Sequence, residues 1–440
     1  MTKTAPRKLR LLPLLAATYF MVSGGPYGLE DIIGGAGYGR ALIILIVLPF
    51  FWSLPTAMMI GELAATVPQE GGFYAWVHRA MGPGWGFQEG WLSLAASIFD
   101  MAIYPTIAVD YLGHIAPSLT AGHRALLLEV AIVLIAALWN LRGAVAVGEG
   151  SIGLWLFALS PFALLVVIGF WKGLHAPHAT LGPPPHMQLS AAFLVAMWNY
   201  MGWDNASTIA GEVEKPQQTY PKVMLLAALM TMLTYVIPTA AVAWAGIPPE
   251  RFSTGAWVDA AQTLGGPLLA LGIMVTASID SMGSFTALTL SYTRLPYAMA
   301  CDGLLPAVLK KRNARNVPWV ALIACATLWA LALGLSFERL ITIDLLLWGM
   351  SVLLEFVALI LLRRREPNLA RPFRIPGPDW VPILFAAGPF LLTIFALWAA
   401  RDEHVGRIPA SLFALGIAAC GIPLYQLAAW IARRRGRTAR

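Results

Sequence analysis

The sequence predicts an all-α membrane protein with twelve transmembrane helices, and its composition is the first reason. Of the 440 residues, 58% are hydrophobic and 12% are charged, which is about half the charged share of a soluble domain. The second reason is that apolar segments near the ~20 residues needed to cross a bilayer recur along the whole chain. Two or three soluble domains, which the length alone would suggest, are therefore excluded.

The expected helices follow one another with short connections and form a single membrane domain over residues 1–440. They cover residues 9–33, 40–66, 85–116, 124–141, 151–171, 189–210, 223–246, 267–300, 318–335, 340–362, 381–400 and 408–432. The first is too long for a cleaved signal peptide and is followed by all the others. Helices 85–116 and 267–300 are long enough to tilt or to extend past the headgroups.

The placement of Lys and Arg predicts the orientation. Only seven of the thirty basic residues fall in loops on the side opposite the N-terminus: Arg40, Arg124, Lys172, Arg251, Arg339, Arg401 and Arg407. Because Lys and Arg accumulate in cytoplasmic loops, we expect both termini in the cytoplasm and the chain in the cytoplasmic membrane. The net charge of +7 then reflects topology and contact with anionic lipid, so it indicates no nucleic-acid partner.

The first expected helix is interrupted by Ser23, Gly24, Gly25 and Pro26. Irregular backbone at membrane depth is tolerated only where protein or a water-filled cavity satisfies its polar groups. We expect a new half-helix to begin at Pro26, where the missing N–H costs nothing. The free N–H groups of such a break attract a carboxylate, and its free carbonyl groups attract a cation.

The sixth expected helix is interrupted in the corresponding place, over residues 198–205. Paired interruptions of this kind are the best sequence indication of a transporter's substrate site. The second break carries Trp198, Tyr200, Trp203 and Asp204, and aromatic faces of this kind suit an ammonium group.

Acidic residues lie inside four of the expected helices, namely Asp100, Asp204, Asp280 and Glu355, and Glu30 lies one to two turns beyond the first break. No Lys or Arg lies deep enough to pair with them, so they favour an external cation, either a proton or an amine. Helical spacing predicts polar stripes of Ser93, Ser97, Asp100 and Tyr104, of Thr276, Asp280 and Ser284, and of Asp344, Trp348, Ser351 and Glu355. Protonated structural carboxyls are the alternative for Asp280 and Glu355.

The sequence contains no sign of an enzyme. It has no HExxH motif, Cys/His cluster, P-loop or dinucleotide fingerprint, and Cys301, Cys325 and Cys420 lie far apart. We expect no metal and no cofactor, and we expect a proton or Na⁺ gradient to supply the energy.

Four tracts resemble the amino acid–polyamine–organocation (APC) transporters. They are the small-residue break at 23–25, residues 61–73 with Gly82 and Pro83, residues 211–216 with Pro221, and residues 294–306. More narrowly, residues 24–31, 84–90 and 100–105, with Trp203 and Asp204, resemble the plant-type polyamine uptake transporters of that superfamily.

This resemblance implies a LeuT-type inverted repeat of five plus five helices, in which 9–171 matches 189–362 and two helices over 381–432 are additional. It also implies uptake of an amine or amino acid with proton coupling. One departure concerns that coupling, because residues 151–171 contain no Lys. The lysine switch of some bacterial relatives is therefore missing.

The combined prediction is a secondary transporter that moves a polyamine or an amino acid by alternating access. The expected substrate-binding residues are Ser23, Gly24, Gly25, Glu30, Asp100, Tyr104, Trp198, Tyr200, Trp203 and Asp204. Asp280, Ser284 and Glu355 are the expected ion-coupling residues. The alternatives are a neutral or cationic amino acid permease or exchanger and, more remotely, an amine sensor without turnover. The sequence leaves open which amine is carried, whether protons or Na⁺ drive it, symport or exchange, and the oligomeric state.

Overall fold

The computed structural model describes residues 8–23, 25–175, 178–179, 181–182 and 186–438, and their regular structure is helical apart from one two-stranded hairpin. The elements are α1 (Leu11–Val22), α2 (Glu30–Phe51), α3 (Ser53–Thr66), α4 (Phe73–Met81), α5 (Pro83–Ile115), α6 (Pro117–Thr120), α7 (His123–Asn140), α8 (Ala144–Gly173), α9 (Leu189–Asn199), the 3₁₀ helix η1 (Trp203–Glu212), α10 (Pro216–Trp244), η2 (Pro249–Arg251), α11 (Trp257–Gly265), α12 (Pro267–Tyr292), α13 (Arg294–Cys301), η3 (Ala307–Lys310), α14 (Trp319–Ala330), α15 (Phe337–Arg365), α16 (Val381–Ala399), η4 (Ala400–Asp402), β1 (His404–Val405), β2 (Ile408–Pro409) and α17 (Ala410–Thr438).

The helices confirm an all-α membrane protein. Within the described residues, nine helical stretches are long and apolar enough to cross a membrane, and α1 and α14 are shorter apolar helices. Most helix ends lie within a few residues of the expected spans. The connection expected at residues 34–39 is wrong, because α2 runs through it and only bends at Gly37, where φ is 74°. The total of twelve crossings stays a prediction.

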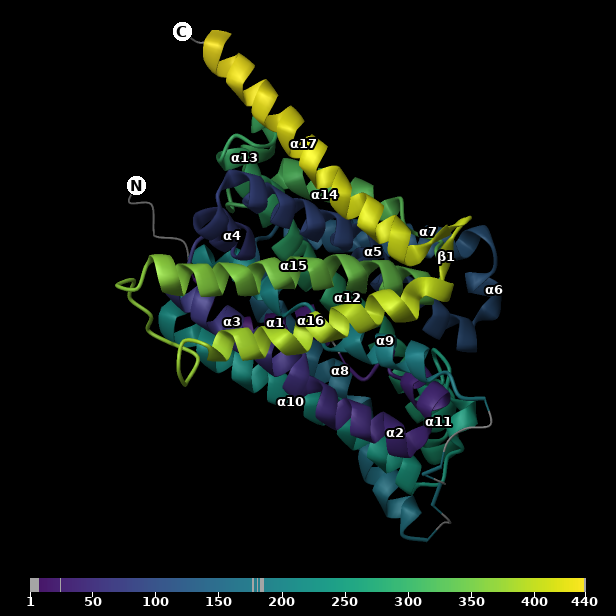
Figure 1. Cartoon of the computed structure of the whole chain (residues 1–440). Coiled ribbons are helices and arrows are strands. Elements are labelled where there is room, and N and C mark those ends of the chain that lie inside the picture. The colour runs from purple at the N-terminus through teal and green to yellow at the C-terminus, as the bar shows by residue number, and fades with distance from the viewer. Residues whose placement is uncertain (1–7, 24, 176–177, 180, 183–185, 439–440) are drawn as a thin grey trace, which may run out of the picture.

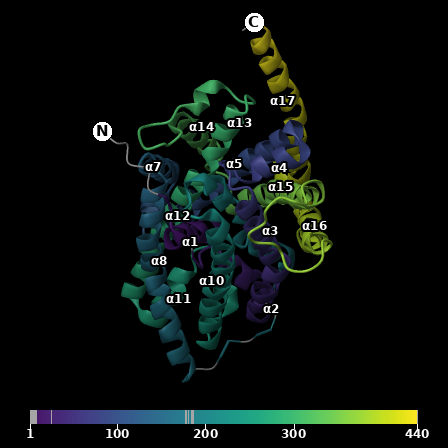
Figure 2. The ribbon, with the colours of Figure 1, turned by 90° about the vertical axis from the view of Figure 1, so that its left-hand side faces the viewer.

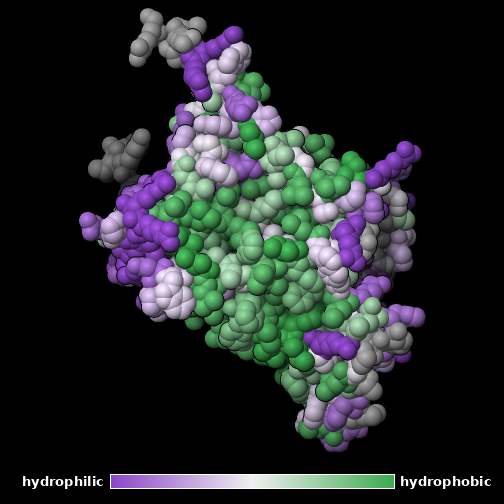
Figure 3. Space-filling model, viewed as in Figure 1, coloured by the Kyte–Doolittle hydropathy of each residue, from purple (hydrophilic) through white to green (hydrophobic). Residues whose placement is uncertain are grey.

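The surface is apolar across the middle of the molecule. Leu127, Val167, Leu268 and Leu391 are between 63% and 81% exposed. Figure 3 shows a hydrophobic band with hydrophilic residues gathered at its left and right edges. An apolar surface of this extent would be a liability in water and is the expected face toward lipid.

The long helices pack around α1, α5, α12 and α15. α5 contacts α12 and α15 along its length, and α1 lies in the interior against α8, α10 and α12 (Figure 2). α16 and α17 lie outside this group, against α15 and α5 (Figure 1). We call the end where α1 begins and α15 ends the basic end, because Arg363, Arg364 and Arg365 close α15 there.

The long helices α5 and α12 each follow a short helix and begin at a Gly-Pro pair, which we call the joint. The nine-residue helix α4 ends before Gly82, and Pro83 opens α5. The nine-residue helix α11 likewise ends before Gly266, and Pro267 opens α12. Both glycines have positive φ, 90° and 79°, which a residue with a Cβ rarely adopts. The two halves of the chain therefore share a local construction.

Both breaks are present, but their bounds differ from those predicted. The second half-helix of the first break begins at Glu30 and not at Pro26. The reasons are that Gly28 has a φ of 80° and that the Pro26 carbonyl accepts a hydrogen bond from Trp257 Nε1 at 2.7 Å. The second break is narrower than residues 198–205, because α9 ends at Asn199 and η1 begins at Trp203.

Candidate functional site

The first break brings the backbone of Gly25 against the carboxylate of Asp280. A methyl group built on Gly25 would lie 3.2 Å from Asp280 Oδ1 and 3.0 Å from the Tyr27 ring. Ser23 follows the end of α1 and its hydroxyl is 3.5 Å from the Gly25 carbonyl oxygen. Gly24, an expected site residue, lies outside the described residues. The break and α12 thus form one contact region.

Asp280 and Ser284 lie one turn apart on α12, and both are buried. Among the described residues, neither Asp280 Oδ1 nor Ser284 Oγ has a hydrogen-bond partner. Burying a carboxylate without a partner is costly. A proton or cation bound at this turn would remove that cost.

The second break holds Asp204 in contact with α15. Trp348 Nε1 donates to Asp204 Oδ1 at 2.8 Å, and Asp204 is 2% exposed. Trp198, in the last turn of α9, stacks edge-on with Phe337 at a centroid distance of 5.7 Å. The start of η1 therefore presents its acid to a space bordered by aromatic rings.

Tyr200 and Trp203 stabilise the conformation of the second break through hydrogen bonds to backbone carbonyl groups. The Tyr200 hydroxyl donates to the Leu45 carbonyl at 2.7 Å, and Trp203 Nε1 donates to the Tyr200 carbonyl at 2.8 Å. Their polar groups are already occupied by backbone. These two residues hold the broken segment in place.

Asp100 on α5 accepts hydrogen bonds from two phenols. Tyr104 donates to Oδ1 at 3.2 Å and Tyr292, on α12, donates to Oδ2 at 2.9 Å. The Tyr104 ring lies 6.3 Å from the ring of Trp198. Asp100 therefore joins the second break through shared aromatic neighbours.

Glu30 is separated from this group. The Tyr111 hydroxyl and the Gly255 N–H, the latter at 3.0 Å, donate to Glu30 Oε1. Tyr111 follows Asp100 on α5 by three helical turns, which is about 16 Å along a helix axis. Glu30 and Asp100 thus occupy different levels of the same helix bundle.

Glu355 faces a second acid, Glu89, which the sequence prediction missed. Both Glu355 oxygens are buried without a hydrogen-bond partner among the described residues, and Glu355 interacts electrostatically with Glu89 and Asp204. Ser351 donates to Glu89 Oε1, and Ser93 Oγ lies 3.1 Å from Ser351 Oγ. Glu89 belongs to the tract 84–90 that carries the family resemblance, which was the available signal.

The acids are closed off at both ends of the bundle. Asp100, Asp204 and Asp280 are at most 4% exposed. Away from the basic end, Thr254 donates to Asp31 at 2.8 Å and Gly255 donates to Glu30, so the segment before α11 covers the start of α2. These acids are therefore shielded from solvent in the structure.

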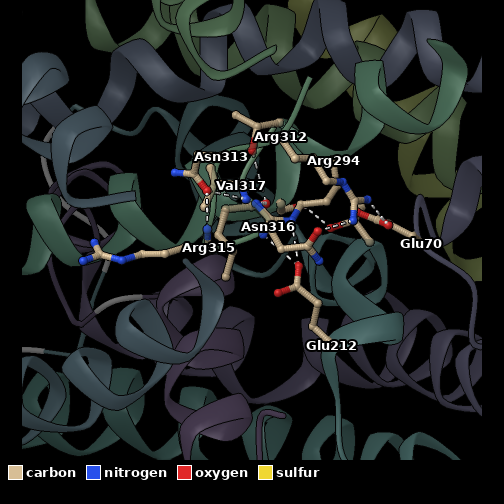
Figure 4. A network of polar contacts seen from close by, with 12 residues as sticks. Glu70, Glu212, Arg294, Arg312, Asn313, Arg315, Asn316 and Val317 are labelled. Atoms are coloured by element: carbon tan, nitrogen blue, oxygen red, sulfur yellow. Dashed lines mark hydrogen bonds and ion pairs between the residues drawn. The ribbon is translucent and has the colours of Figure 1, made fainter. Parts of the chain in front are cut away.

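Backbone pairing and ion pairs close the basic end. The N–H of Leu9 donates to the Glu212 carbonyl at 2.8 Å. Figure 4 shows Arg294 joined to Glu212 and Arg312 reaching Glu70; their shortest N–O distances are 2.7 and 2.5 Å. These contacts tie the residues before α1 to the end of η1, the end of η1 to α13, and the loop after η3 to the connection between α3 and α4.

The described residues hold no group of three His, Cys, Asp or Glu side chains that could bind a metal ion. Cys301, Cys325 and Cys420 are free thiols. The buried acids themselves are groups that can bind protons or cationic groups.

Comparison with known proteins gives the family. The amino acid permease family model matches residues 15–420. The "Polyamine transporter PUT1" of Oryza sativa subsp. japonica is 32% identical over 436 residues, which are 98% of this chain and 80% of that protein. The "Polyamine transporter RMV1" of Arabidopsis thaliana is 31% identical over 420 residues, 93% of this chain and 84% of that protein. The "Serine/threonine exchanger SteT" of Bacillus subtilis (strain 168) is 25% identical over 374 residues, 82% of this chain and 84% of that protein.

These matches confirm both resemblances expected from the sequence motifs, the broad one to APC transporters and the narrow one to plant polyamine transporters. The family match spans both breaks and nearly all of the helices described above. This chain therefore belongs to the amino acid permease family and is a multi-pass membrane transporter, not an enzyme.

Proposed function

We propose that this protein is a secondary active transporter that carries a polyamine across the cytoplasmic membrane by alternating access. One observation carries the choice of substrate: Asp100 and Asp204 are buried beside the second break, no described residue gives them a cationic partner, and aromatic rings lie around them. Ammonium groups bind carboxylates and aromatic faces. The plant relatives named as polyamine transporters support the same choice.

The proposed architecture is a LeuT-type fold of twelve crossings. Residues 9–171 and 189–362 would be inverted repeats within one domain, 1–440, and the two helices over 381–432 would be additional. The matching joints at Gly82–Pro83 and Gly266–Pro267 support this arrangement. The packing of the two short helices also supports it: α4 packs on α5 and α15 in the first half, and α11 packs on α12 and α8 in the second.

The substrate would lie between the two breaks. Asp100, Asp204, Tyr104 and Trp198 would bind one ammonium end, and Glu30 would receive a cationic group during passage along α5. Ser23, Gly24 and Gly25 would supply backbone groups from the first break. Tyr200 and Trp203 would act by holding the second break.

Protons are the proposed coupling ion, carried by Asp280 and Glu355. Both side chains hold buried carboxylate oxygens without a partner among the described residues, and protonation removes the cost of burying them. Ser284 lies next to Asp280 and would be a ligand if Na⁺ were the coupling ion instead. Both termini would face the cytoplasm, because the basic loops lie at their end of the bundle.

Amino acid exchange is the second candidate function, and the first break favours it. The irregular backbone around Gly25 suits an α-carboxylate, and one relative is named as a serine/threonine exchanger. In this case the backbone of the first break would matter more than Asp100.

Uptake into proteoliposomes tests the polyamine proposal. We expect Asp204→Asn and Asp100→Asn each to lower uptake of radiolabelled spermidine about tenfold or more, because each removes a charged hydrogen-bond partner of an ammonium group. Glu338→Gln, an exposed acid on α15, is the matched control and should transport normally. Unchanged spermidine uptake in both buried-acid variants would refute the proposal, and serine uptake by the wild type would favour exchange.

A further inference from the structure

Asp344 is a buried carboxylate to which the transport scheme above assigns no role. It lies on α15 with an exposure of 0%, and neither oxygen has a hydrogen-bond partner among the described residues. Trp348 lies one helical turn further on and donates to Asp204 Oδ1. Side chains four residues apart share a helix face, so Asp344 faces the second break beside Trp348.

Asp100 approaches the same space from α5. Asp344 interacts electrostatically with Asp100 and Asp204, and with Tyr104 and Tyr292, the two phenols that donate to Asp100. α5 and α15, which carry the two acids, pack directly on each other. Three carboxylates from α5, η1 and α15 therefore surround one buried region.

The described residues supply no fixed cation to this region. The buried guanidinium groups of Arg294 and Arg363 are paired with Glu212 and Glu62. Buried carboxylates without a partner are strongly unfavourable. The compensating charge must therefore arrive with a ligand or as protons.

The three acids lie on three different helices, α5, η1 and α15. No three acidic, His or Cys side chains of the described residues are grouped closely enough to hold one metal ion. A linear molecule with separate positive groups can contact carboxylates that different helices supply. An α-amino acid does not match, because its own carboxylate would enter a region that already contains three.

We propose that Asp344 completes, with Asp100 and Asp204, a three-carboxylate site that binds more than one ammonium group of a linear di- or polyamine. Asp344 is then the residue that selects polyamines over monoamines and amino acids. This inference rests on the proposed transport function, since it names the substrate class of the same site.

Equilibrium binding to the purified full-length protein tests the inference. The probes are 1,4-diaminobutane and 1-aminobutane, which share a four-carbon chain and differ by one ammonium group. The wild type should bind the diamine about tenfold or more tightly than the monoamine, since each charged hydrogen bond contributes a factor of this order. Asp344→Asn should lower diamine affinity about ten- to a hundredfold and leave monoamine affinity nearly unchanged.

Two further variants separate charge from structure. Asp344→Glu keeps the charge and should restore part of the diamine preference, whereas Glu338→Gln removes an exposed acid from the same helix and should bind like the wild type. Diamine affinity that is unchanged in Asp344→Asn overturns the inference. If Asp344→Asn does not fold, equal wild-type affinities for the two probes overturn it.

The same measurements distinguish failure of the inference from failure of the proposed function. Wild-type binding of the diamine together with an unaffected Asp344→Asn variant rejects the role of Asp344 alone. Wild-type binding of serine and of neither amine rejects the polyamine transporter as well.

Discussion

Gly25 lies in tight contact with side chains that surround the first break. A methyl group there meets the Tyr27 ring at 3.0 Å and Asp280 Oδ1 at 3.2 Å. We expect Gly25→Ala to fold normally but to lower polyamine uptake about tenfold, because the methyl group displaces the break from Asp280 and small misplacements at a site are costly. Uptake of radiolabelled substrate into proteoliposomes measures the effect.

Gly153→Ala on α8 is the matched control for that substitution. A methyl group at Gly153 meets no atom within 4 Å, so its uptake should equal that of the wild type. Equal uptake in the Gly25 and Gly153 variants would contradict the tight contact between the first break and Asp280.

Individual acids could be predicted from the sequence only where they fall in mid-span. Asp100 and Asp204 were identified because no basic residue accompanies them at that depth. Helical spacing placed Asp344 on an inward stripe with Trp348 and Glu355 but gave it no role, and Glu89, near the start of its expected span, was missed. The neighbours of these two acids depend on how α5 and α15 pack on each other, which spacing along one chain segment does not reveal.

At the scale of elements, a buried ion pair fastens α3 to α15. Arg363 donates to both oxygens of Glu62, at 2.8 and 2.5 Å, and the Ile375 N–H donates to the same carboxylate at 2.7 Å. Removing one partner of such a pair leaves an uncompensated buried charge, which costs about 3–5 kcal/mol. We expect Glu62→Gln to lower the Tm of the detergent-purified protein by several degrees, measured by fluorescence during heating.

An exposed pair at the same end of α15 supplies the control. Arg79 donates to Glu366 and holds the pKa of that carboxyl below its ordinary value, so the pair is intact at neutral pH and is lost only in acid, when the carboxyl takes up a proton. Exposed pairs contribute about 0–1 kcal/mol, and Glu366→Gln should hardly change the Tm at pH 7. A Tm drop as large as that of Glu62→Gln would contradict the distinction between the two pairs.

The helices could be predicted from the sequence and the details of the breaks could not. Hydropathy placed the long spans well, because each must be apolar over its whole crossing. The half-helix after Pro26 begins four residues later than expected, because Trp257 binds the Pro26 carbonyl. That partner lies more than two hundred residues away in the sequence, and no local rule indicates it.

At the scale of the whole molecule, coupling depends on buried acids away from the breaks. We expect Glu355→Gln to abolish spermidine accumulation driven by an imposed pH gradient and to retain exchange of internal for external spermidine, because exchange needs no net proton movement. Radiolabelled uptake with and without the gradient, and counterflow in loaded proteoliposomes, measure the two activities.

Proton coupling through Glu355 would be contradicted if the wild type accumulated spermidine in response to an Na⁺ gradient and not in response to the pH gradient. Asp280→Asn tested in the same way shows whether the first break or the Glu89–Glu355 pair carries the proton.

The burial of carboxylates without cationic partners affects whether the carrier can close without its substrate. An empty carrier with ionised acids could reach this closed form only by moving bare charges out of water, which is prohibitively costly. A positive ligand, or protons in its place, must therefore neutralise the acids before the site can close. The cost of burying the ionised acids thus opposes closure with neither cargo nor protons bound, in addition to the ion pairs that close the basic end.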